Sequence, residues 1–226
     1  MSEQMWNEAQ SIITATENHT FLTSMVDGTL SKEKFVYYVK QDAIYLNDYA
    51  ECLSRLSEKC PNQTHAKRLK EMAKGAEKDE KDMHRSFFKK WKINDDEEVK
   101  AMPNTLLYTS YILRIVSLKP YAEGLAVLLP CFWVYMHVGK KMLNLRKALG
   151  DSVSRSPEFD AWIDMYASDE FEKDVTDYRS IVDDFVDSSD CDEGMIKKMK
   201  HHFVRCCQLE HMFWDQAEEL IQWPGL

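Results

Sequence analysis

Three residues in this sequence combine the side chains for covalent and acid–base chemistry with positions where hydrophobic residues are expected. Cys131 directly follows a proline inside an almost wholly apolar run, residues 125–135. Asp42 and Glu210 each interrupt a stripe of apolar residues that repeats at helical spacing. A thiolate is a nucleophile, and a carboxylate taken out of water shifts its pKa toward values that suit proton transfer. The three residues therefore predict a pocket for nucleophilic and acid–base chemistry.

The same residues also have a structural interpretation. A buried cysteine is most often a small and inert core residue. A buried carboxylate is tolerated when a Tyr, His or Arg from a facing helix satisfies it, and each carboxylate taken alone favours that interpretation. Two carboxylates beside a thiol-bearing helix, in a chain with ten tyrosines, shift the balance toward a pocket.

A metal-dependent oxygenase is the main chemical alternative. Glu80 and His84 are four residues apart in a predicted helix, and Glu210 and His211 are adjacent in another. Di-iron bundles use Glu-x-x-His from each of two helices, whereas the first pair has one residue too many and occurs once. A contact that stabilises the helix explains it better. The adjacent pairs His201-His202 and Cys206-Cys207 lack zinc-site spacing, and we expect neither a metal nor an organic cofactor.

Long helices are the elements that must position these side chains. Seven glycines and six prolines are few for 226 residues, which disfavours an all-β fold with its many turns. Helical periodicity predicts an all-α protein with no convincing strand, and the expected helices cover residues 3–17, 21–25, 31–60, 63–91, 103–118, 121–149, 157–166, 168–187 and 190–220. Ser31, Ser168 and Asp190 are the expected N-caps, and Gly28 and Gly150 the expected stops.

Charge and composition exclude several classes of function. The net charge of −9 disfavours non-specific binding to nucleic acid or to anionic membranes. No uninterrupted apolar run reaches the roughly 18 residues of a membrane span. The first residues show no basic region followed by an apolar one, so we expect no secretory signal. The six cysteines are then free thiols in a reducing compartment, and we expect a cytoplasmic protein.

Five motifs, which span most of the chain, together resemble the TenA/thiaminase II family, in its cysteine-containing branch. They are QDAIYL (41–46), YTSYIL (108–113), LPCFWVY within 128–135, WIDMYASDEF (162–171) and LEHMFWDQA (209–217). The resemblance implies a haem-oxygenase-like helical bundle, one domain over residues 1–226, and a homotetramer.

The resemblance also assigns roles at matching positions. It implies that Cys131 is the nucleophile, that Glu210 is the acid/base, and that Asp42 hydrogen-bonds an aminopyrimidine. Four tyrosines would line the pocket or stack on the substrate: Tyr45, Tyr108, Tyr135 and Tyr166. Ala43 stands where an aromatic residue is frequent in the family, which leaves the substrate preference open.

The activity implied is hydrolysis of 4-amino-5-aminomethyl-2-methylpyrimidine to the 5-hydroxymethyl compound in thiamine salvage, with thiamine itself as a second candidate substrate. A non-catalytic protein that binds a pyrimidine and serves regulation is a further alternative. Binding without turnover would distinguish it from the enzyme.

Overall fold

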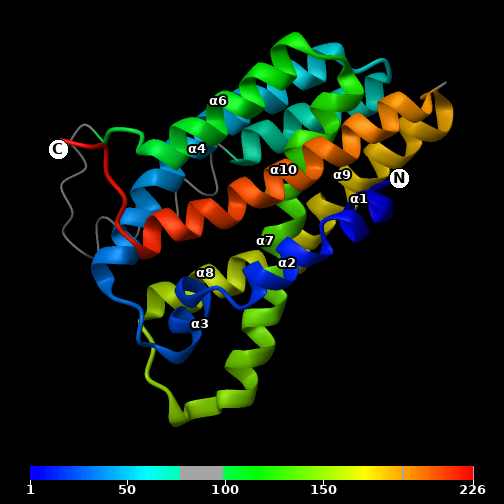
Figure 1. Cartoon of the computed structure of the whole chain (residues 1–226). Coiled ribbons are helices and arrows are strands. Elements are labelled where there is room, and N and C mark those ends of the chain that lie inside the picture. The colour runs from blue at the N-terminus through cyan, green and yellow to red at the C-terminus, as the bar shows by residue number, and fades with distance from the viewer. Residues whose placement is uncertain (77–98, 190, 226) are drawn as a thin grey trace.

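Helix α7 (Tyr121–Leu149) is the element around which the others pack (Figure 1). The computed structural model describes residues 1–76, 99–189 and 191–225. Over those residues it is built from helices and contains no strand, which confirms the all-α prediction. Besides a helical stretch at 63–76, they are α1 (Ser2–Glu8), α2 (Gln10–Glu17), α3 (Thr20–Asp27), α4 (Lys32–Lys59), α6 (Pro103–Leu118), α8 (Pro157–Tyr166), α9 (Asp169–Ser188), α10 (Glu193–Glu218) and the short 3-10 helix η1 (Gly150–Ser152).

The burial of α7 follows from its sequence. Its first half is apolar on all sides, and a helix of this kind is stable in water only inside other helices. Helices α3, α4, α6, α8, α9 and α10 all contact it. By length and composition α7 could cross a membrane, but 89% of its most apolar 18-residue window is buried within the protein. We therefore interpret α7 as the core helix of the bundle.

Two buried tyrosines hold the helical turn that precedes Pro130. A proline inside a helix removes one backbone donor and crowds the preceding turn. Nevertheless, α7 runs continuously through Pro130. The Tyr178 hydroxyl donates to the carbonyl of Leu125 at 3.1 Å, and the Tyr49 hydroxyl donates to the carbonyl of Leu128 at 2.8 Å. These bonds tie α9 and α4 to the segment that carries Cys131.

The helix ends follow local signals in the sequence. Ser31 and Ser168 cap their helices as predicted, each accepting a hydrogen bond from the backbone N–H three residues later. Gly28 ends α3 in the left-handed conformation, with φ of 77°. The predicted cap Asp190 lies outside the described residues. Asp192 instead caps α10, accepting from the backbone N–H of Met195 at 2.7 Å.

The single helix predicted for residues 3–17 is wrong. The chain forms α1 and α2, separated at the fully buried Ala9. Helix α1 packs on α9 and α10, whereas α2 packs on α7 and α10. The break lets each short segment turn its own apolar side toward the bundle, with Met5 buried from α1 and Ile13 from α2.

Gly139 allows α7 to approach α8 closely. A Cβ built there would lie 2.7 Å from the carbonyl carbon of Tyr166 and 3.0 Å from the backbone nitrogen of Ala167. We expect Gly139→Ala to lower the free energy of unfolding by about 1–3 kcal/mol because backbone atoms must move. Urea denaturation measures the change. Gly75→Ala is the control, since no heavy atom lies within 4 Å of its added Cβ; equal stability of the two variants would contradict the expectation.

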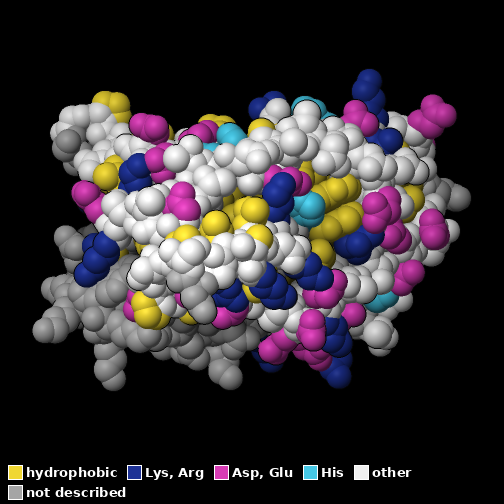
Figure 2. Space-filling view, turned by 90° about the horizontal axis from the view of Figure 1, so that it is seen from below, with side chains coloured by type: hydrophobic (Ala, Val, Ile, Leu, Met, Phe, Trp, Pro, Cys, Tyr) yellow, Lys and Arg dark blue, Asp and Glu magenta, His cyan; other side chains and the backbone are white. Residues whose placement is uncertain are grey.

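The surface carries charges of both signs. Figure 2 shows Asp and Glu side chains interspersed with Lys and Arg over one face, with hydrophobic side chains visible between them. All six cysteines are free thiols, as predicted.

Candidate active site

Cys131 lies on the wall of a cavity of about 160 Å³. Its thiol is half-buried, which leaves it within reach of a small molecule that enters the cavity. The walls come from five parts of the chain: Asp42, Leu46 and Tyr49 of α4; Met72, Gly75 and Ala76 of the helical stretch 63–76; Phe132 and Tyr135 of α7; Met165 and Tyr166 of α8; and Ser168, Glu170, Phe171 and Asp174 at the start of α9.

Glu210 is buried beside this cavity and holds a proton at neutral pH. Its side chain on α10 is 1% exposed, and the Tyr108 hydroxyl of α6 donates to its Oε1 at 2.8 Å. Burial raises the pKa of Glu210 to about 8, and the negative charge of Asp42 adds to this. The hydrogen bond from Tyr108 acts in the opposite direction because it favours the carboxylate. Glu210 can therefore act as a general acid near pH 7.

Tyr45 and Tyr108 form a buried aromatic layer next to Glu210. Their ring centroids are 4.8 Å apart. Burial raises the pKa of Tyr45 well above its ordinary value, with further contributions from Cys131, Tyr108 and Glu210. The Tyr45 hydroxyl is buried and has no hydrogen-bond partner of good geometry among the described residues. Both phenols are neutral donors close to the thiol and the acid.

Tyr135 has its hydroxyl fixed by a relay of donors. The indole N–H of Trp162 donates to the Tyr38 hydroxyl at 3.2 Å, and that hydroxyl donates to the Tyr135 hydroxyl at 3.3 Å. Burial raises the pKa of Tyr135, and Tyr38, Glu210 and Asp42 raise it further. The ring of Tyr166 packs beside it, with centroids 4.8 Å apart.

All seven residues singled out from the sequence lie in or directly behind one site. The cavity walls include Asp42, Cys131, Tyr135 and Tyr166. The other three, Tyr45, Tyr108 and Glu210, form the adjoining buried group.

Sequence reasoning missed the wall that α9 contributes. None of the roles predicted from the sequence fell to Glu170 or Asp174, although both line the cavity. A signal was present only within α9, where Glu170 and Asp174 are four residues apart and therefore lie on the same face of the helix. The stretch 63–76 gave no chemical signal of its own, since its cavity residues Met72, Gly75 and Ala76 carry no reactive group.

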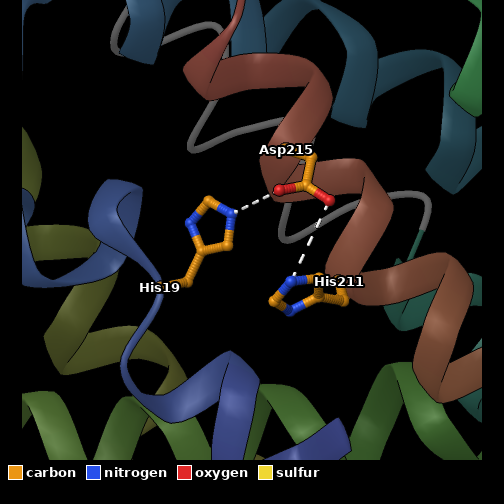
Figure 3. Close-up of side chains that lie close together, drawn as sticks. All are labelled: His19, His211 and Asp215. Carbon is orange, nitrogen blue, oxygen red and sulfur yellow. Dashed lines mark hydrogen bonds and ion pairs between the residues drawn. The ribbon is translucent and has the colours of Figure 1, made fainter.

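A separate cluster of two histidines and one aspartate connects the N-terminal helices to α10. Figure 3 shows His19 and His211 directed toward Asp215. His19 Nδ1 accepts the backbone N–H of Phe21 at 3.1 Å, so a neutral His19 carries its proton on Nε2. That nitrogen faces Asp215 Oδ1 at 3.1 Å and has no lone pair for a metal ion. We interpret the cluster as a hydrogen-bonded structural contact.

Of the residues of the alternative metal site, the structure describes Glu210 and His211. Glu80 and His84 lie outside the described residues. Glu210 is bonded to Tyr108, whereas His211 interacts through Nδ1 with the Thr16 hydroxyl at 3.0 Å. The adjacent Glu210 and His211 thus have different partners, on α6 and on α2.

The described residues thus form an all-α bundle with a thiol, carboxylates and aromatic rings at one cavity. A domain with a heme oxygenase-like fold from Shewanella denitrificans superposes with a TM-score of 0.73, at 13% identity over 97% of this chain and 90% of that one. A TenA homologue from P. horikoshii superposes with a TM-score of 0.85, at 23% identity over 96% and 98% of the two chains.

Residues 6–220 match the TENA/THI-4/PQQC family, and the chain belongs to this family. An aminopyrimidine aminohydrolase from Bacillus subtilis is 32% identical over 207 residues, which are 91% of this chain and 84% of the relative. The family and the haem-oxygenase-like fold that the sequence motifs implied are thereby confirmed.

Proposed function

We propose that the protein is an aminopyrimidine aminohydrolase of the thiaminase II type that serves thiamine salvage, with Cys131 as its nucleophile. Its substrate is 4-amino-5-aminomethyl-2-methylpyrimidine, and thiamine is the second candidate substrate. The observation that carries the proposal is the meeting of the Cys131 thiol, the Asp42 carboxylate and a protonated Glu210 around one aromatic cavity. The activity named for the Bacillus subtilis relative supports it.

Each of these residues has a defined task in the reaction. Asp42 holds the amidine edge of the ring and orients it. Glu210 donates its proton to a ring nitrogen, which makes the neighbouring carbon more electrophilic. The Cys131 thiolate adds to the ring carbon next to the one that bears the substituent, and a C–S bond forms.

The electron-rich adduct then expels the leaving group. The C–N bond breaks, and its electron pair departs with the amine. A water molecule adds to the exocyclic methylene, the C–S bond breaks, and the thiolate and the aromatic ring are restored. Glu210 takes back the ring-nitrogen proton in this second half, and the departed amine takes up the proton that the added water loses. The aromatic walls, Tyr135 and Tyr166 among them, fit a flat ring and limit the access of bulk water.

The direct test is incubation of the purified protein with the aminomethyl pyrimidine and, separately, with thiamine. We expect chromatography to detect 4-amino-5-hydroxymethyl-2-methylpyrimidine from both, and faster release from the aminomethyl compound. Tight binding of the pyrimidine without product would contradict the proposal and would identify a binding protein. The homotetramer and the cytoplasmic location remain predictions, and light scattering of the purified protein tests the first.

A further inference from the structure

The described wall of the cavity has an unbalanced negative charge. Asp42, Glu170 and Asp174 line it, whereas none of the described residues that line it is a Lys, Arg or His. Asp42 lies on α4 and is 2% exposed, and the proposed reaction uses it to hold the ring. The remaining two carboxylates come from α9 and have no task in that reaction.

Asp174 is neutralised by neighbouring charges. Arg68, in the helical stretch 63–76, forms ion pairs with Asp174 and with Asp177, the latter at 2.8 Å. Lys173 also pairs with Asp177 at 2.6 Å. These four side chains carry two positive and two negative charges. The group therefore contributes little net charge to the cavity.

Glu170 is a carboxylate of this wall that no described residue compensates. It is exposed, lies in the first turn of α9, and forms no ion pair with any described residue. Its position is fixed by the cap of Ser168 on the Phe171 backbone N–H, at 3.1 Å. The Phe171 ring packs edge-on against Tyr166, with centroids 5.1 Å apart, which holds this turn against the cavity.

We infer that Glu170 is a specificity-determining residue that selects pyrimidines whose 5-methylene carries a cationic leaving group. This inference rests on the proposed function. In this proposal the buried Asp42 holds the ring on the inner side of the cavity, and the 5-substituent extends toward the outer side, where the exposed Glu170 lies. A primary alkylamine is protonated at neutral pH. The carboxylate of Glu170 attracts that ammonium group and repels a phosphorylated substituent.

The negative charge of Glu170 is also compatible with the way in which the C–N bond breaks. An ammonium group departs as a neutral amine when the electron pair of the C–N bond moves to nitrogen. Glu170 holds the leaving group in this protonated form before the bond breaks. The contact is exposed to solvent, so the expected discrimination is a factor of about 1.5–5 and decreases with salt.

Binding of two pyrimidines that differ in charge tests the inference. The cationic 5-aminomethyl compound and the neutral 5-hydroxymethyl compound are titrated calorimetrically into Cys131→Ser protein, which does not turn over. Adding Glu170→Gln should weaken binding of the cation about 1.5- to 5-fold at low salt and leave the neutral compound unchanged. The preference should fade at about 0.5 M salt, where charges on the surface are screened.

The matched control is Glu172→Gln, which removes the same charge from the same helical turn. Glu172 does not line the cavity and pairs with Lys140. An equal loss for both pyrimidines in Glu170→Gln, or the same loss in the control, would overturn the inference. Failure of the proposed function would give a different result. Wild-type protein would then bind both pyrimidines without releasing product.

Discussion

Cys131→Ser is expected to lose turnover by a factor on the order of 10³ or more in kcat while it keeps the fold and the pyrimidine site. A serine hydroxyl is far less ionised than a thiol at neutral pH and adds poorly to a ring carbon. The substitution is nearly isosteric, and the half-buried position tolerates a hydroxyl. The measurement is single-turnover release of the hydroxymethyl pyrimidine, with calorimetric binding of the aminomethyl compound to the same variant.

The control for this experiment is Cys191→Ser. Cys191 is also a half-buried free thiol, but it interacts with Ser189 and lies outside the cavity. Its variant should turn over at the wild-type rate. If Cys131→Ser turned over normally, the nucleophile assignment would be refuted even though the cavity and its other residues remained.

Glu210→Gln is expected to reduce kcat/KM by about 10²–10⁴ because the amide cannot donate or accept the transferred proton. The pH profile gives a second readout. With a pKa of about 8, Glu210 is protonated below pH 8 and ionised above it. The wild-type rate should therefore fall as pH rises through about 8, and this fall should be absent from the residual activity of Glu210→Gln.

The same pKa predicts how stability depends on pH. The folded protein retains the Glu210 proton up to about pH 8, whereas the unfolded chain releases it near 4.5. The folded state thus binds more protons between these values, and the free energy of unfolding decreases as pH rises from 4.5 to 8. Ionisation of this group lowers the free energy of unfolding by about 5 kcal/mol over that pH range. Urea denaturation at several pH values should show a flatter dependence for Glu210→Gln.

Tyr108→Phe tests how the hydrogen bond from Tyr108 sets the pKa of Glu210. The Tyr108 hydroxyl stabilises the carboxylate form of Glu210, so its removal raises the pKa of Glu210 further. The fall in rate should move to higher pH. If the fall in rate at alkaline pH were unchanged in both Tyr108→Phe and Glu210→Gln, another group would control the alkaline side of the pH–rate profile.

The sequence by itself determined most of the helices and the residues that break their pattern. Ser31 and Ser168 cap helices, Pro103 and Pro157 open them, and Gly28 ends one, because these effects act within a few residues of the chain. Asp42 and Glu210 stood out for the same reason, since a buried stripe has a fixed helical period. The family motifs then assigned roles that composition and spacing had left open.

Only the tertiary structure decided how these residues act on one another. The bond from Tyr108 to Glu210 joins positions 102 residues apart, and the charge of Asp42 on Glu210 comes from yet another helix. The break at Ala9 and the place of Glu170 on the cavity wall likewise depend on which helices meet. Burial, and the pKa that follows from it, is a property of the packed bundle. No single helix carries enough neighbours to exclude water from a carboxylate.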